Sequence, residues 1–228
     1  MSELVFSNPL FGLSVSILSY ALGVLLQKRI RLAICNPLLV SYCVIMVILL
    51  SFHIPYDWYN KGGNILAVFL TPATASLAIN VYRQRAFVQK YAVALFTGTF
   101  AGSVFSLSFI FLVSKWVGLS NEIAFSLLPK SITTAMALAV AETIGGVPSI
   151  CVVAVVITGV LGNMLSPVLI RVLGVKNPVV QGIAIGTSSH AIGTAKANEM
   201  GEVQGALSSV ALVLSGIITY ILAVLFFS

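Results

Sequence analysis

Apolar runs long enough to cross a bilayer follow one another along almost the whole chain. Because about 20 apolar residues span the hydrocarbon core as a helix, this pattern predicts an all-α polytopic membrane protein with seven or eight hydrophobic segments. Only 8% of the residues are charged, against roughly 25% in soluble domains, so we expect a single transmembrane domain over residues 1–228. The predicted segments are 8–27, 36–53, 63–82, 91–115, 122–143, 147–171, 179–196 and 203–227.

Basic residues predict how these segments alternate across the membrane. The positive-inside rule places clusters of Lys and Arg in the cytoplasm, but simple alternation of eight spans would put the last cluster outside. The conflict disappears if segment 122–143 enters the membrane and returns on the same side. We therefore expect seven spans, an external N-terminus and a cytoplasmic C-terminus. The clusters are Lys28, Arg29 and Arg31; Arg83, Arg85 and Lys90; and Arg171 and Lys176.

This topology predicts an inverted repeat between residues 36–115 and 147–227, linked by the broken segment 122–143. The three segments of the first half would run opposite in direction to those of the second half, so that 91–115 opposes 203–227. The middle segment of each half contains small and hydroxyl residues, in "FLTPATASLAIN" (69–80) and "IGTSSHAIGTAK" (185–196). Interrupted helices in corresponding positions of two halves indicate the binding site of a transporter.

The stretch "SLLPKSITTAMALA" (126–139) carries the strongest candidate for a ligand contact. Pro129 interrupts a helix, and Lys130 lies about 8 residues from the nearest loop, roughly 12 Å deep if helical. An ionisable residue at such a depth indicates function. Lys130, Ser131, Thr133 and Thr134 could bind an anion together with the free amides of a following half-helix. The alternative is a structural lysine in a short tilted segment that reaches the interface.

The stretch 185–196 adds Ser188, Ser189, His190 and Thr194 as candidate substrate contacts. A break in a membrane helix persists only against protein or a wet cavity, since unpaired backbone groups are costly in lipid. His190 could donate a hydrogen bond to a carboxylate or carry a coupled proton. The alternative is a histidine bonded to a neighbouring helix, with glycines that serve close helix packing.

Other polar residues give weaker predictions. Thr71 and Thr74 in the first interrupted segment are further candidate substrate contacts, and Glu142 is a second candidate for proton or ion coupling. Asn163 is expected to join two helices by a hydrogen bond. The stretch "SFHIPYDWYNKGG" (51–63) reads as a polar loop with aromatic residues at the membrane interface.

Several functional classes lack sequence support. The chain has no HExxH, Walker A or CxxC pattern, so we expect no enzyme, no metal site and no cofactor. Ser189 and His190 are adjacent, and adjacent helical side chains point apart, which disfavours a catalytic dyad. The net charge of +6 reflects membrane topology, and no nucleic-acid partner is expected.

Three motifs resemble those of the LrgB/CidB family of bacterial inner-membrane proteins. They are "FLTPATASLAINVYRQ", "SLLPKSITTAMALAVAETIGGVPS" and "GIAIGTSSHAIGTAKANEMGEVQGALSS", and the similarity extends over about residues 10–226. The resemblance implies an antiholin-like role in controlling murein hydrolase activity and lysis. It also implies small-carboxylate transport, because a plastid relative is a glycolate/glycerate translocator and some bacterial relatives are linked to pyruvate transport. A smaller membrane protein of the LrgA/CidA type is the partner that the resemblance implies.

Together these patterns predict a multi-pass protein of the bacterial inner membrane that carries small monocarboxylates by alternating access at interrupted helices. Glycolate, glycerate and pyruvate are the expected substrate class, and a homo-oligomer such as a dimer is expected. One alternative is a holin- or antiholin-like protein that modulates murein hydrolases and lysis. Another is a subunit that mainly supports its smaller partner.

Overall fold

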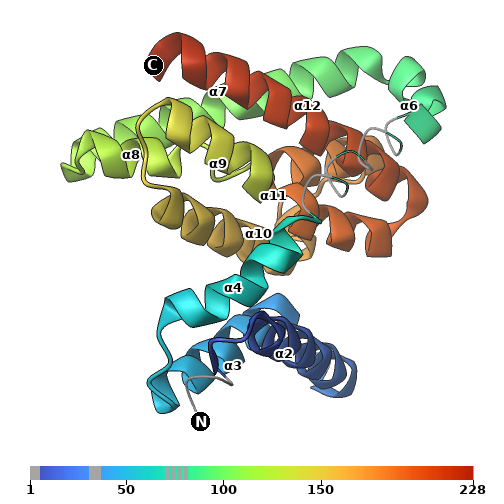
Figure 1. Ribbon diagram of the computed structural model, residues 1–228. Helices are drawn as coiled ribbons and strands as arrows, with labels where there is room; N and C mark the ends of the chain where they lie inside the picture. The colour runs from blue at the N-terminus through green and yellow to red at the C-terminus, as the bar shows by residue number, and fades with distance from the viewer. Residues whose placement is uncertain are drawn as a thin grey trace. The chain divides into compact units, whose positions relative to one another are not determined.

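The computed structural model describes residues 6–30, 37–69, 72, 75, 79 and 82–227, and every regular element in these ranges is a helix. Four of the helices are long and apolar enough to cross a membrane, which confirms the predicted all-α polytopic class. The chain divides into two compact units, Met1–Ala75 and Ser76–Ser228, whose helices are labelled in Figure 1.

Unit 1 contains α2 (Pro9–Ile30), α3 (Pro37–Ser51) and α4 (Tyr56–Ala67). Helix α4 occupies most of the stretch 51–63, so the prediction of a polar loop there is wrong. The reason is tertiary packing, because Gly12 of α2 and Gly62 of α4 let the two backbones approach closely. The hydroxyls of Ser16 and Tyr59 lie 2.8 Å apart across the same contact.

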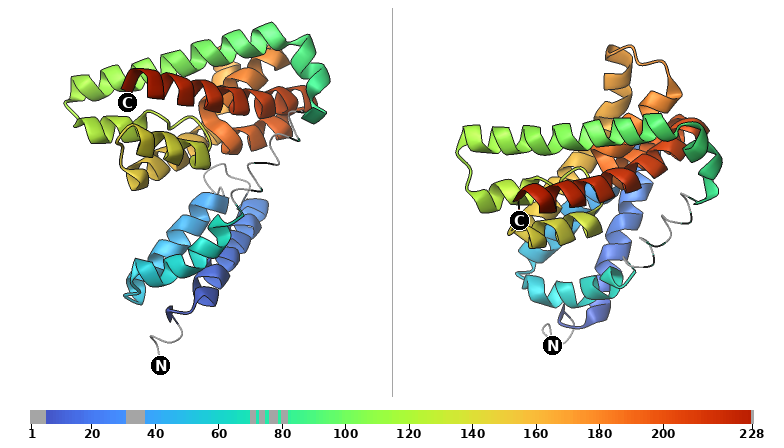
Figure 2. Two further views of the ribbon diagram at one scale, coloured as in Figure 1. Left: turned by 45° about the horizontal axis from the view of Figure 1, so that its top comes forward. Right: turned by 90° about the horizontal axis from the view of Figure 1, so that it is seen from above.

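Unit 2 contains all of the remaining helices of the described chain. Helices α7 and α12 lie side by side and run in the same direction (Figures 1 and 2). Near their starts Leu95 and Leu207 belong to one buried cluster, and at their ends the rings of Phe111 and Phe227 are 5.0 Å apart. The helices are α6 (Arg85–Lys90), α7 (Ala92–Val117), α8 (Asn121–Leu127), α9 (Thr134–Thr143), α10 (Pro148–Val172), α11 (Pro178–Met200) and α12 (Glu202–Phe227).

This parallel arrangement corrects part of the predicted inverted repeat. Segments 91–115 and 203–227 were expected to run in opposite directions, but they pack in the same direction. The cause is that 179–196 turns back on itself, as 122–143 was expected to do, so the chain crosses unit 2 one time fewer than predicted. The predicted opposite directions of segments 36–53 and 63–82 relative to 147–171 and 179–196 stay a prediction, because the earlier segments include residues of unit 1.

Helices α8 and α9 form a helical hairpin, as expected for a segment that enters and returns. Helix α8 stops at Leu127 and α9 starts at Thr134, with a turn that contains Pro129 and Lys130 between them. The chain reverses there and returns to α8, where the amide of Val147, just after α9, donates a hydrogen bond of 2.6 Å to the hydroxyl of Ser126. We call residues 121–143 the Lys130 hairpin.

Helix α11 is a second helical hairpin, sharper than the interruption that the sequence indicated. Ser189 (φ −135°, ψ 17°) and His190 (φ 41°, ψ −141°) leave the helical conformation. On α12, Gln204 contacts the Gly182 position and Gly205 contacts Asn198. In a straight helix Gly182 and Asn198 would be roughly 24 Å apart, so the two arms of α11 must fold back on each other. We call residues 178–200 the His190 hairpin.

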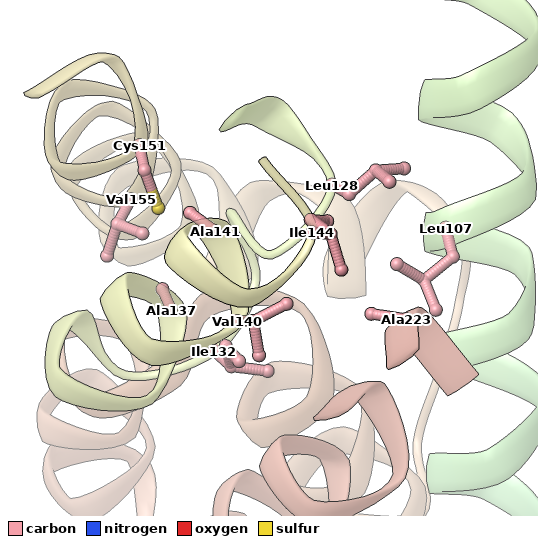
Figure 3. Packing of buried hydrophobic residues seen from close by; sticks show 10 residues of the cluster. All are labelled: Leu107, Leu128, Ile132, Ala137, Val140, Ala141, Ile144, Cys151, Val155 and Ala223. Atoms are coloured by element: carbon pink, nitrogen blue, oxygen red, sulfur yellow. The ribbon is translucent and has the colours of Figure 1, made fainter. Parts of the chain in front are cut away.

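A buried core joins the Lys130 hairpin to the long helices of unit 2. Figure 3 shows Ile132 and the α9 residues between α10, which contributes Cys151 and Val155, and the pair Leu107 of α7 and Ala223 of α12. Small residues of α9 such as Ala137 and Ala141 are fully buried. Their small side chains let α9 pack closely against α10, which fixes the position of the turn that bears Lys130.

Two of the predicted cytoplasmic clusters lie at the same end of unit 2. Arg85 and Lys90 are in α6, and Arg171 and Lys176 flank the end of α10, where the chain enters the His190 hairpin. A buried cluster that contains Val179, with Tyr91 and Val203 packed against it, holds this end together. We call it the basic end. The positive-inside rule assigns it to the cytoplasm.

The last helix ends away from the basic end of unit 2. Helix α12 starts at the basic end and finishes at the opposite end, beside the last turns of α7. The prediction that the C-terminus lies on the same side of the membrane as the basic clusters is therefore wrong for unit 2. It assumed that 179–196 crosses the membrane, whereas this segment enters and returns.

Candidate functional site

A cavity of about 400 Å³ lies where the turns of the two hairpins approach the middle of α7. It brings together three residues predicted from two separate motifs: Lys130 and Ser131 of the Lys130 hairpin and Ser188 of the His190 hairpin. We call it the hairpin cavity. Its lining residues are Gly98, Gly102, Phe105, Ser106, Phe109, Ile110, Lys130, Ser131, Ala184, Thr187 and Ser188.

Lys130 supplies the positive charge of the hairpin cavity. Its Nζ atom donates a hydrogen bond of 3.3 Å to the Ser131 hydroxyl, which lies 3.1 Å from the hydroxyl of Ser106. Within the described ranges the one ion pair joins Lys196 to Glu199, so no described carboxylate neutralises Lys130. A partly buried ammonium without a counter-ion favours the entry of an anion.

The wall formed by α7 was missed by the sequence reasoning. Gly98 and Gly102 let α11 approach α7 closely, and a Cβ atom at Gly102 would lie 2.7 Å from Cγ2 of Thr187. One turn further on, Phe105 and Phe109 stack with a ring separation of 5.7 Å. The spacing of four residues between the two glycines is the signal that could have identified this contact.

His190 is not among the residues that line the hairpin cavity, and its side chain contacts α10. Its Nε2 atom is 2.9 Å from the carbonyl oxygen of Val155, and the side chain is 3% exposed. Gly159 makes room for the imidazole, because a Cβ atom there would overlap the ring. In this conformation His190 fixes the turn of its hairpin against α10, and direct contact with a substrate stays a prediction.

Hydroxyls beside the turn satisfy the groups that the break exposes. The hydroxyl oxygens of Ser188 and Ser189 lie 3.0 Å apart, and Ser189 packs against Gly162 of α10. Thr194 donates a hydrogen bond of 2.8 Å to the carbonyl of His190, and its hydroxyl also lies 2.8 Å from that of Ser208. Such contacts compensate the backbone groups freed in a broken membrane helix.

The predicted helix contact of Asn163 is confirmed. Its side-chain amide donates a hydrogen bond of 3.0 Å to the carbonyl of Ile192, just beyond the turn of the His190 hairpin. Together with the contact between His190 and Val155, this bond joins α10 to the turn from both sides. The hairpin is thus held by α10, while the cavity lies on its other face.

The remaining predicted residues lie outside the lining of the hairpin cavity. Thr133 is the N-cap residue of α9, and in the described structure its buried hydroxyl has no hydrogen-bond partner. Thr134 begins α9, and Glu142 is exposed near its end. Thr71 and Thr74 lie outside the described residues.

The arrangement suits a small organic anion. One ammonium group, hydroxyls from three segments and two aromatic rings surround a cavity of about 400 Å³. No group of three His, Cys, Asp or Glu that could hold a metal occurs in the part of the chain that the structure describes.

Comparison with known proteins identifies the chain's relatives. A model of the LrgB-like family matches residues 16–228. The chain belongs to the LrgB-like family. It is 36% identical over 220 residues to a protein named antiholin-like protein LrgB from Bacillus cereus strain B4264. The aligned residues make up 96% of each of the two chains. A protein of the same name from Bacillus anthracis shows the same identity and coverage. No solved structure matches the chain.

Proposed function

We propose that this LrgB-family chain is a membrane carrier of small monocarboxylates in the glycolate, glycerate or pyruvate class. The observation that supports the proposal best is the convergence of two helical hairpins on one cavity that contains Lys130. A carboxylate would bind the Lys130 ammonium, and the hydroxyls of Ser131, Ser106 and Ser188 would bind the second oxygen function.

The two hairpins suggest how access would alternate. The His190 hairpin starts and ends at the basic end, whereas the Lys130 hairpin starts and ends at the opposite end. Each hairpin therefore separates the cavity from one side of the membrane. Movement of one turn at a time would expose the bound anion to one side and then to the other.

Uptake by proteoliposomes tests this proposal. The purified chain is reconstituted alone and with a smaller LrgA-type membrane protein, and uptake of labelled pyruvate, glycolate and glycerate is measured. We expect saturable uptake that Lys130→Gln abolishes and that Lys196→Gln, an equal change of charge in an exposed ion pair, leaves intact. Equal uptake by wild type and Lys130→Gln would exclude this carrier mechanism.

A second function is antiholin-like modulation of murein hydrolases and lysis, exerted with an LrgA-type partner. The names of the relatives favour this function over the carrier, whereas the geometry of the hairpin cavity favours the carrier. Lysis rates and murein hydrolase activity of cells that lack the gene, complemented with wild type or Lys130→Gln, test it. Full complementation by a variant that has lost uptake would assign the two functions to different parts of the molecule.

We further propose that the protein is not an enzyme, lies in the bacterial inner membrane and assembles as a homo-oligomer. The absence of a catalytic motif in the sequence, the apolar helices and the family membership support these points. Chemical cross-linking in native membranes, followed by mass determination, tests the oligomer.

A further inference from the structure

A second hollow in unit 2 is separate from the hairpin cavity and has a different chemistry. It has a volume of about 710 Å³ and lies between α7, α8 and α12 at the end opposite the basic end. We call it the apolar groove. Most of its lining is apolar, including Val104, Phe111, Leu112, Phe125, Leu222 and Phe227.

The apolar groove has one cationic side chain, and it lies at the mouth. Lys115 is in the last turn of α7, where its Nζ atom donates a hydrogen bond of 2.9 Å to Asn121 and lies 5.5 Å from the ring centroid of Phe111. No described carboxylate pairs with it. The neighbouring Trp116 is 88% exposed, as expected for an aromatic residue at the level of the lipid headgroups.

The depth of the groove matches a single leaflet. From Lys115 to Val104 the lining follows α7 for roughly 16 Å, at about 1.5 Å per residue, which is half of a hydrocarbon core of about 30 Å. An acyl chain needs only one leaflet and has its charged headgroup at the interface, where Lys115 lies.

We propose that the apolar groove binds an anionic phospholipid, with an acyl chain between α7 and α12 and the headgroup phosphate at Lys115 and Asn121. The acyl chain would contact Phe125 of α8 and Phe227 of α12, whose rings are 5.9 Å apart. Because α8 is the first arm of the Lys130 hairpin, the bound lipid would brace that hairpin against α7 and α12. The evidence for this lipid site does not depend on the proposed transport function.

Lipid binding to the purified chain tests the proposal. The full chain in detergent is titrated with phosphatidylglycerol or phosphatidylcholine, and bound lipid is measured by native mass spectrometry. We expect tighter binding of phosphatidylglycerol and a loss of about fivefold in its affinity for Lys115→Gln, the effect of one lysine near a membrane surface. The matched control Lys176→Gln removes an exposed charge at the basic end and reports the general attraction of anionic lipid to one lysine, so it should lose less affinity than Lys115→Gln.

A second variant tests the acyl part of the site separately. Ser108→Trp places an indole in the groove and should reduce binding of both lipids to a similar degree. Lys115→Gln should weaken binding of phosphatidylglycerol more than that of phosphatidylcholine, because the choline cation already offsets the charge of the phosphate. Size-exclusion chromatography confirms that each variant is folded before the titration. Equal phosphatidylglycerol binding by wild type and Lys115→Gln would overturn the proposal. Recovery of a membrane protein instead of lipid in the groove, shown by cross-linking from position 108, would overturn it as well.

Discussion

The backbone at His190 gives the sharpest prediction, because it reverses the usual ranking of two substitutions. His190 has φ 41°, a conformation that costs a non-glycine residue about 1–3 kcal/mol. His190→Ala and His190→Gly both remove the imidazole and its contact with Val155, but only glycine also removes the backbone strain. Glycine inside a helix is normally about 0.5–1 kcal/mol less stable than alanine. Here we expect His190→Gly to be the more stable variant by about 1 kcal/mol.

Thermal unfolding of the purified protein in detergent measures this difference. For a chain of this size about 1 kcal/mol corresponds to roughly 2–4 °C in Tm, so His190→Gly should unfold at a Tm higher than His190→Ala by that amount. Both variants should be less stable than wild type, because each loses a buried hydrogen bond and leaves a cavity.

The neighbouring residue provides a matched control. Ala191 has helical backbone angles within α11, so Ala191→Gly should lower the stability by about 0.5–1 kcal/mol, the ordinary effect in a helix. A Tm for His190→Ala equal to or above that of His190→Gly would refute the account of the turn. The same holds if glycine stabilised position 191.

Three further predictions follow from the arrangement of unit 2. Gly159→Ala should destabilise the protein because the new Cβ overlaps the imidazole of His190, and the loss should shrink when it is combined with His190→Gly in a double-mutant cycle of Tm values. In a cysteine-free background, a cysteine that replaces Phe226 should react with an impermeant thiol reagent added outside intact cells, whereas a cysteine that replaces Lys176 should not. The reverse pattern would contradict the location of the C-terminus on the side opposite the basic end. Ser106→Ala should raise the KM for uptake severalfold with little change in Vmax, because one hydroxyl of the cavity contributes binding, whereas an unchanged KM would remove Ser106 from the site.

The breaks were predictable from the sequence because their causes are local. Pro129 has no amide hydrogen and cannot continue α8, and Lys130 is too polar for a lipid-facing helix. The run from Thr187 to His190 is similarly too polar for an uninterrupted apolar span. Both interruptions were therefore expected at the positions where the structure has them.

The direction that the chain takes after a break was not predictable in the same way. The reversal in α11 depends on a positive φ at His190, which is uncommon outside glycine and has no signature in apolar periodicity. The error in the direction of 203–227 followed from it. Helix α4 was missed because its stability comes from contact between Gly12 and Gly62, far apart in the sequence.

Only part of the candidate site was predictable from the sequence, because some of its residues are brought together by the fold alone. Lys130, Ser131 and Ser188 stand out as polar residues within apolar segments, and the structure places them around one cavity. Ser106, Gly98 and Gly102 occur in a helix with no other unusual feature, so only the fold brings them to the site. His190 stands out equally in the sequence, but its side chain packs against α10.

The central claim is that the two hairpins form an anion site around Lys130, and equilibrium binding tests it most directly. Binding of pyruvate, glycolate and glycerate to the purified chain would be measured by calorimetry for wild type, Lys130→Gln and the control Lys196→Gln. A hydrogen bond to a charged group contributes about 1.5–3 kcal/mol, so we expect saturable binding that Lys130→Gln weakens at least tenfold and Lys196→Gln does not change. Binding of the same strength to wild type and Lys130→Gln would contradict the claim.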